Sequence, residues 1–132
     1  MIVGKQKHLA LIISRELATQ LATATFIADA SGELVFYNEA AEDILGRTFA
    51  EAGAMTAAER ASLFQVEDLN GSEVAPERLP SAIALAEKRP VHERLRIVGL
   101  DGVRRSISVT AIPLFAHPTE VVGVMAHFWE QG

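Results

Sequence analysis

The last apolar segment, Val121–Trp129, constrains the fold more than any other stretch of the sequence. Successive side chains of a β-strand point to opposite faces of the sheet. Val121 and Met125 lie on one face of this segment. Val124 and Phe128 lie on the other. A strand that is apolar on both faces requires cover on both, from helices of the same chain or from a second subunit.

Four other strands are predicted, in two hairpins. Thr23–Ala30 and Glu33–Tyr37 are joined by an Asp-Ala-Ser-Gly turn, whose residues suit tight turns. His92–Val98 and Val103–Leu114 are joined by Asp101-Gly102, a strong hairpin signal. Odd positions of the second of these strands are mostly apolar and even ones polar, which is typical of a half-buried strand.

Three short helices are predicted between the hairpins. Asn38 is a preferred N-cap for residues 39–45, and Gly46 ends that helix. Thr56 begins a capping box with a glutamate three residues later and opens a helix to about residue 64. Pro80 stands where a third helix, residues 81–88, begins, and Pro90 follows its end.

The N-terminal segment, residues 5–21, has the spacing of an amphipathic helix. Leu9, Ile13 and Leu17 form one stripe, with Ile12 beside it. An isolated helix of this length is marginal in water, so the stripe must pack on its own domain or on a second copy, and the pattern favours neither. We expect residues 1–21 to form this cap or dimerisation helix, residues 22–130 the domain, and residues 131–132 a tail. Helix, strands, helices and strands in this order indicate an α+β fold with one antiparallel sheet.

Composition excludes several functions. The 132 residues suit one domain, and the chain has no cysteine, so disulfides, thiolate metal sites and cysteine nucleophiles are ruled out. The net charge of −5 disfavours nucleic acid. The apolar run Leu9–Ile13 is far shorter than the roughly 20 residues of a membrane span, and no signal-peptide cleavage site follows it. We therefore expect a cytoplasmic protein with no membrane or nucleic-acid partner.

Several phrases of the sequence resemble the PAS family. They are Phe26–Asp29 with Gly32–Glu42, the Ile-Leu-Gly of residues 44–46, Asp101-Gly102, Pro113-Leu114 and Val122–Val124. The resemblance implies a five-stranded antiparallel sheet with short helices on one face and a pocket between them. It also implies that the N-terminal helix mediates a homodimer and that the domain regulates an output domain or partner (a kinase, phosphatase or transcription factor), in cis or in trans.

The residues of this sequence argue against the cofactors that members of the family bind. The light-sensing relatives that form covalent adducts use a cysteine, which is absent here. Flavin needs amide side chains where Ile107 and Met125 are expected, and the helix that often supplies a haem ligand contains no histidine. His127 is the one candidate iron ligand, and a core or rim histidine is the simpler interpretation. No zinc-like spacing occurs, so we expect no metal and no cofactor.

A mostly apolar pocket remains, suited to a small apolar ligand such as a fatty acid or a small aromatic molecule. The residues expected to line it are Phe36, Ile44, Leu45, Met55, Leu63, Phe64, Leu79, Ile83, Leu95, Ile97, Ile107, Val109, Met125 and His127. The residues expected at a dimer interface are Leu9, Ile12, Ile13, Leu17, Val122, Val124 and Phe128.

Three functions are consistent with these patterns. The first is a signal-sensing module that binds a ligand, dimerises, or does both. The second is an interaction domain whose packed core binds nothing. The third and weakest is a small cone-shaped α+β enzyme, because only His127, Arg105 and Glu93 offer acid or base groups near inward strand positions, and no nucleophile motif occurs. We therefore expect no enzyme activity.

Overall fold

A five-stranded antiparallel sheet, in the order β2-β1-β5-β4-β3, forms the centre of the molecule. The structure is a computed structural model that describes the backbone of residues 2–131 and the side chains of residues 9–131. The strands are β1 (Ala24–Asp29), β2 (Leu34–Tyr37), β3 (Val91–Val98), β4 (Arg104–His117) and β5 (Glu120–Glu130). β5 lies in the middle of the sheet, between β1 and β4, which explains why both of its faces are apolar.

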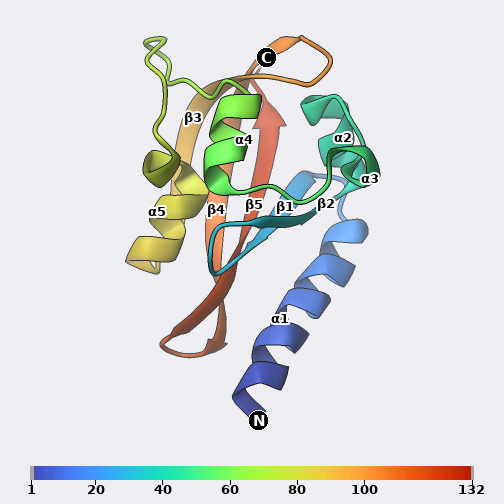
Figure 1. Cartoon of the computed structure of the whole chain (residues 1–132), viewed down its shortest axis with the longest axis vertical. Coiled ribbons are helices and arrows are strands. Elements are labelled where there is room, and N and C mark those ends of the chain that lie inside the picture. Colours follow the sequence, from blue (N-terminus) through green and yellow to red (C-terminus); the bar gives the residue numbers. More distant parts are fainter. Residues whose placement is uncertain (1, 132) are drawn as a thin grey trace.

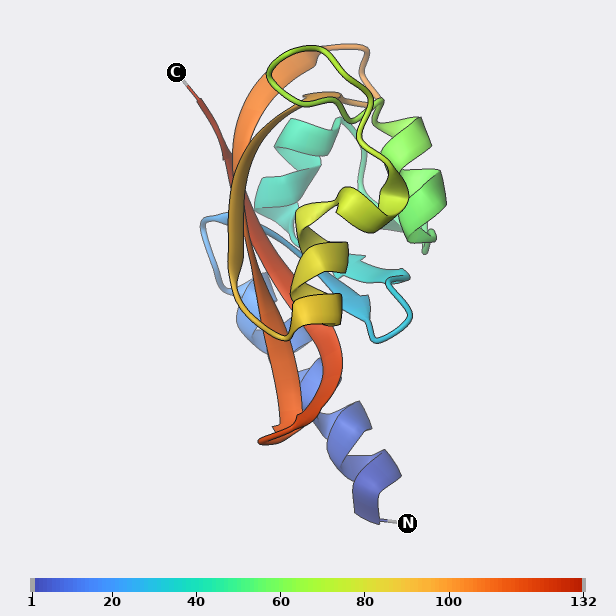
Figure 2. The ribbon, with the colours of Figure 1, turned by 90° about the vertical axis from the view of Figure 1, so that its left-hand side faces the viewer.

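The short helices lie together on one face of the sheet, which we call the inner face (Figure 1, Figure 2). They are α2 (Glu39–Leu45), α3 (Phe49–Ala52), α4 (Ala57–Leu63) and α5 (Pro80–Glu87), with a 3-10 helix at Pro76–Arg78. The predicted fold class, an α+β domain with this sheet and an N-terminal helix, is confirmed.

The predicted helix boundaries rest on local chemistry. The Asn38 side chain accepts a hydrogen bond from the Ala41 N–H, and Gly46 closes α2 in the left-handed conformation, which favours glycine. The capping box at the start of α4 is also present: Thr56 accepts from the Glu59 N–H, and the Glu59 carboxylate accepts from the Thr56 N–H. These predictions needed no knowledge of tertiary contacts.

The main core lies between the inner face and the short helices. It includes residues of all five strands, represented by Ala28 in β1, Leu34 in β2, Leu95 in β3, Val109 in β4 and Phe128 in β5. A smaller cluster, formed by Ala18, Ile27 and Met125, lies on the opposite, outer face of the sheet.

Helix α1 (Ile2–Thr19) covers part of this outer face (Figure 2). Ser14 and Ala18 are buried, and Leu11 approaches β5 at Gly123 so closely that an added Cβ there would lie 2.9 Å from the Leu11 Cδ2 atom. The Arg15 guanidinium lies 4.9 Å from the centre of the Phe36 ring on β2. Helix α1 thus packs on its own domain through residues other than the predicted stripe.

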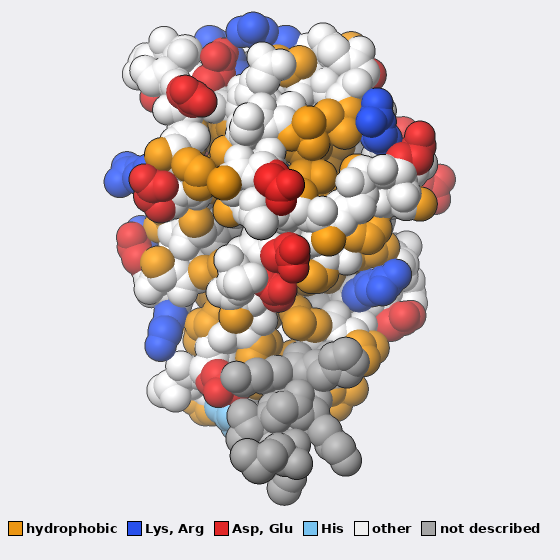
Figure 3. All heavy atoms as spheres, in the orientation of Figure 1, with side chains coloured by type: hydrophobic (Ala, Val, Ile, Leu, Met, Phe, Trp, Pro, Cys, Tyr) orange, Lys and Arg blue, Asp and Glu red, His pale blue; other side chains and the backbone are white. Residues whose placement is uncertain are grey.

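The predicted stripe on α1 is exposed to solvent, and Figure 3 shows hydrophobic side chains at the surface in the region of this helix. Leu9, Ile13 and Leu17 are exposed over 52–58 % of their surface, and Ile12 over 44 %. Small side chains at positions 14 and 18 let the helix lie close to the sheet, and this contact turns the larger apolar residues outward.

The predicted orientation of β5 is wrong. Val124 and Phe128 belong to the main core on the inner face, and Val122 is also buried, so none of the three is free to form a dimer interface. Met125 belongs to the outer cluster. A shift of one residue exchanges the two faces of a strand, and the apolar pattern of a strand covered on both sides does not reveal which face is which.

Candidate ligand cavity

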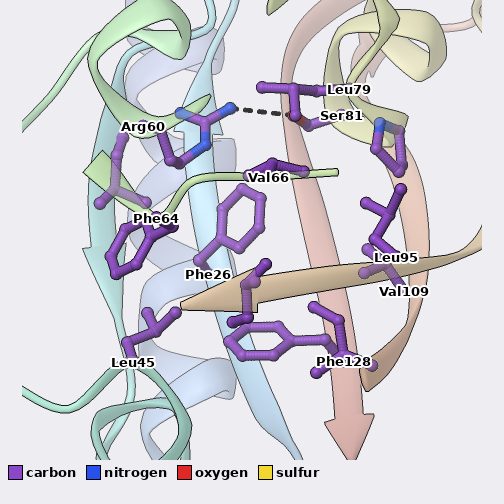
Figure 4. A pocket seen from close by; sticks show the side chains of 14 residues that line it. Phe26, Leu45, Arg60, Phe64, Val66, Leu79, Ser81, Leu95, Val109 and Phe128 are labelled. Carbon is purple, nitrogen blue, oxygen red and sulfur yellow. Dashed lines mark hydrogen bonds between the residues drawn. The ribbon is translucent and has the colours of Figure 1, made fainter. Parts of the chain in front are cut away.

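An apolar cavity of about 70 Å³ lies between the inner face of the sheet and the helices α4 and α5. Figure 4 shows three aromatic rings around it, those of Phe26, Phe64 and Phe128. The Phe26 and Phe128 rings lie 6.1 Å apart between centroids, in a tilted arrangement. The other lining residues are Leu34, Leu45, Arg60, Val66, Leu79, Pro80, Ser81, Leu95, Ile97, Ile107 and Val109.

One charged side chain, that of Arg60, belongs to this wall. Arg60 is only 7 % exposed, and burial lowers the pKa of its guanidinium to about 10. The guanidinium donates hydrogen bonds to the Gly32 carbonyl oxygen (3.1 Å) and to the Ser81 hydroxyl (2.9 Å). It also lies 5.1 Å from the centre of the Phe26 ring. The cavity is therefore apolar along most of its wall, with one cationic group at its edge.

A surface groove of about 450 Å³ lies on the other side of Arg60. Arg60 and Ser81 line both the groove and the cavity, and the groove continues over the β1–β2 turn at residues 30–32. The hydrogen bond between these two side chains thus lies where the cavity and the groove adjoin (Figure 4).

Half of the residues predicted to line the pocket do so. They are Leu45, Phe64, Leu79, Leu95, Ile97, Ile107 and Val109. Met55 is buried elsewhere in the main core, Ile44 and Ile83 pack against that core, and Leu63 is exposed.

Three other predicted residues lie on the wrong side of the sheet. Met125 and Phe36 belong to the outer cluster. Met125 therefore does not occupy an inward position where a flavin-binding amide would be expected, and its apolar side chain says nothing about flavin. His127 follows Met125 by two positions and shares its face. Its Nδ1 shares a 2.9 Å hydrogen bond with the Thr25 hydroxyl, and burial lowers the pKa of the imidazole. His127 is a rim histidine and does not face the cavity.

The sequence predictions missed Phe26, Leu34, Arg60, Val66, Pro80, Ser81 and Phe128 as lining residues. The sequence contains a signal for Arg60. It lies four positions before Phe64, so the two residues lie on the same face of the helical turn, and Phe64 is a core residue. Phe26 alternates with Ala24 and Ala28, two inward residues of β1.

The residues that line the cavity include no carboxylate and no histidine that could act as an acid, a base or a metal ligand. Among the residues that the structure describes, no group of three or more potential ligands could hold a metal ion. Arg105 forms ion pairs with Asp101 (3.1 Å) and Glu130 (3.0 Å), outside the cavity. Within the described chain, no helix is both long and apolar enough to cross a bilayer.

A single antiparallel sheet with short helices over one face and an apolar cavity between them defines a class of small α+β domains. The sequence places the chain more closely: it belongs to the PAS family, because the sequence model described as PAS fold matches residues 18–131. PAS domains are typically sensor or signalling modules, and generally regulatory ones rather than enzymes.

Solved PAS structures share the fold at low identity. The LOV protein of Rhodobacter sphaeroides has a TM-score of 0.73 at 17 % identity, over 93 % of this chain and 68 % of that one. The PAS domain of the fruit-fly ELK potassium channel has a TM-score of 0.69 at 11 % identity, over 91 % and 95 %. The PAS domain of nitrogen regulation protein NR(II) from Vibrio parahaemolyticus has a TM-score of 0.60 at 15 % identity, over 90 % and 98 %. No curated protein sequence matches the chain.

Proposed function

We propose that this chain is a cytoplasmic signal-sensing PAS module that works as a homodimer and regulates an output domain or a partner protein without enzyme activity of its own. The observation that carries this proposal is the contrast between the two sides of α1, one of which packs on the sheet while the other is exposed. The helix contacts the outer face of the sheet through Leu11, Ser14 and Ala18, and it presents Leu9, Ile13 and Leu17 to solvent.

The exposed side of α1 is suited to a second copy of the same helix. Large apolar side chains that gather on one surface of a monomer indicate an interaction site. The outer side of the sheet adds Ile112 and Trp129, exposed over 37 % and 42 % of their surface. A two-fold dimer would bury each of these residues twice.

The cavity supports a sensory role for this dimer. An apolar space with a small number of polar groups is typical of small-molecule sites. A ligand there would touch both the short helices and the inner face of the sheet, whose outer face contacts α1. The second candidate, an interaction domain that binds no ligand, shares the dimer surface and differs only in leaving this cavity unused.

Sedimentation velocity of the wild-type chain and two variants tests the dimer. We expect a concentration-dependent two-subunit mass for the wild type. Ile13→Glu places a charge at an exposed apolar position. Half-burial of one such side chain contributes about 1 kcal/mol and occurs twice in a symmetric dimer, so the dissociation constant should rise at least about tenfold.

The control variant is Gln20→Glu, which adds the same charge at an exposed polar position just after α1. It should dimerise like the wild type. A wild-type chain that stays at one subunit mass at all concentrations, or an Ile13→Glu variant that dimerises normally, would refute the proposed role of α1.

A further inference from the structure

Arg60 is a buried cation with no acidic partner among the residues that the structure describes. Its neighbours at the guanidinium are neutral: a carbonyl oxygen, a hydroxyl and an aromatic ring. A pKa of about 10 keeps the group protonated near neutral pH. Burial of an unpaired charge is costly, and side chains such as arginine are rarely buried this fully unless an anion accompanies them.

The hydrogen-bonding capacity of Arg60 is only partly used. A guanidinium has five N–H donors in a planar fork. The Gly32 carbonyl and the Ser81 hydroxyl accept two of these, and the others meet no acceptor within the described part of the chain. Such a fork matches the two oxygens of a carboxylate, which it binds through parallel hydrogen bonds.

We propose that the cavity binds a small monocarboxylate with a compact apolar body, and that Arg60 anchors its carboxylate. This inference rests on the ligand-binding part of the proposed function and names the ligand class. The body would lie among the Phe26, Phe64 and Phe128 rings, which Figure 4 shows below the guanidinium. The carboxylate would lie at the boundary of cavity and groove, where Arg60 and Ser81 meet.

Charge and volume limit the ligand further. A single cation in an otherwise apolar wall suits one negative charge, whereas a phosphate dianion needs more donors and more charge than this wall supplies. A cavity of about 150 Å³ accommodates benzene, so a space of about 70 Å³ limits the ligand to a compact apolar body, and an aromatic ring or a short aliphatic chain would extend to the boundary with the groove or displace some of the lining side chains. Long-chain fatty acids do not fit without expansion of the core.

Benzoate and hexanoate are the probes, with benzamide and hexanamide as their neutral isosteres. Each is titrated into the full chain near neutral pH, and binding is followed by the amide ¹H–¹⁵N signals of Gly32, Ser81 and Val66. We expect saturable shifts with at least one of the two acids, and at least tenfold weaker binding of the matching amide.

Two variants test the role of Arg60. Arg60→Met keeps much of the side-chain volume and removes the charge, and we expect it to lose at least tenfold in affinity for the acid while its affinity for the amide changes little. Arg78→Met, the control, removes a positive charge from an exposed position of the 3-10 helix and should bind the acid like the wild type.

The alternative is that Arg60 only ties the β1–β2 turn to α5. In that case acid and amide bind equally well, or Arg60→Met binds benzoate as the wild type does, and either result overturns the inference. Equal binding of acid and amide leaves the proposed sensory function intact, because the cavity then takes a neutral ligand. Absence of binding by all four compounds overturns the carboxylate site, while sedimentation decides the dimer separately. If Arg60→Met does not fold, the comparison of acid with amide on the wild-type chain still decides the question.

Discussion

Asn38 is the residue whose substitution should affect stability most for its size. Its side chain is buried beside the end of α1 and the start of α2. The Oδ1 atom accepts hydrogen bonds from the N–H groups of Thr25 and Ala41, each at 3.0 Å. The Nδ2 group donates to the carbonyl oxygens of Ala18 and Thr23, each at 2.9 Å. One amide group thus ties the helix, the first strand and the following helix together.

Replacement by alanine removes all of these bonds at once. Loss of an N-cap side chain costs about 1 kcal/mol. A buried backbone N–H left without a partner costs about 1–3 kcal/mol, and the Thr25 N–H belongs to a residue with no exposed surface. The carbonyls of Ala18 and Thr23 keep hydrogen bonds from the Leu21 N–H and the Thr25 hydroxyl, so the loss of their bonds to Asn38 adds only about 1 kcal/mol. Asn38→Ala should therefore lower the free energy of unfolding by about 3–5 kcal/mol, a large share of the roughly 5–15 kcal/mol of a typical domain.

Urea unfolding followed by circular dichroism measures this loss. The matched control is Thr48→Ala, which removes another N-cap: the Thr48 hydroxyl accepts one hydrogen bond, at 3.2 Å, from the Glu51 N–H at the surface. It should cost about 0.5–1 kcal/mol. Asn38→Asp separates the two halves of the amide, because it keeps an acceptor for the N–H groups and places a carboxylate oxygen against the carbonyls of Ala18 and Thr23.

The reasoning fails if Asn38→Ala costs no more than Thr48→Ala. It also fails if Asn38→Asp is as stable as the wild type, because the contacts of Nδ2 with α1 would then contribute nothing.

Two further predictions concern the outer face. Gly123→Ala would bring a Cβ to 2.6 Å from the Ala28 carbonyl oxygen and 2.9 Å from the Leu11 Cδ2 atom. The variant should therefore lose about 1–3 kcal/mol of unfolding free energy in urea and show faster hydrogen exchange in α1. Unchanged stability and exchange would contradict this packing. Burial lowers the pKa of His127, so below about pH 6.5 the unfolded chain binds more protons and stability falls as the pH drops towards the folded-state pKa. His127→Gln should remove part of this loss, measured as the change in unfolding free energy between about pH 7.5 and pH 5; an identical slope in the variant would assign the pH dependence to other groups.

Much of this fold could be predicted because its signals are local. Asn38, Gly46 and Thr56 mark helix ends through hydrogen bonds and backbone conformations that involve only nearby residues. Asp101-Gly102 likewise marks a hairpin turn that the pairing of β3 with β4 confirms.

The faces of β5 could not be predicted because they depend on register. Phe128 pairs with Val109 and His127 with Thr110 across β4 and β5. Paired residues share a face, so an inward Val109 requires an inward Phe128 and an outward His127. That pairing depends on the geometry of the loop between the two strands, and β4 shows register irregularities near Phe115.

The lining of the cavity could also be predicted only in part. Their apolar character predicted a core without showing which residues surround a space and which merely fill the interior. Arg60 was overlooked because charged residues are mostly exposed; its spacing from Phe64 indicated an inward position, but its partners, the Gly32 carbonyl and the Ser81 hydroxyl, come from distant parts of the sequence.

The side chains of Arg60 and Asn38 contact neighbouring residues of β1, Phe26 and Thr25. Phe26 faces the cavity and the Arg60 guanidinium, whereas Thr25 binds Asn38, which in turn holds the last turn of α1 through the Ala18 carbonyl. A ligand that moved the Phe26 ring would therefore act on a strand whose preceding residue, Thr25, is linked through Asn38 to α1.

This arrangement predicts that a bound carboxylate changes hydrogen exchange in α1 and that this change depends on Asn38. Benzoate should alter the exchange rates of the α1 amides in the wild type, and Asn38→Asp, which lacks the donors to α1, should reduce that response while still binding benzoate in the cavity. A physical link between two sites requires an element that both of them bias, and the contacts of Thr25 and Phe26 make this segment the element that we expect to couple them. Equal responses in the wild type and in Asn38→Asp would mean that any signal reaches α1 by a different route, such as the contacts of the helix with β4 and β5.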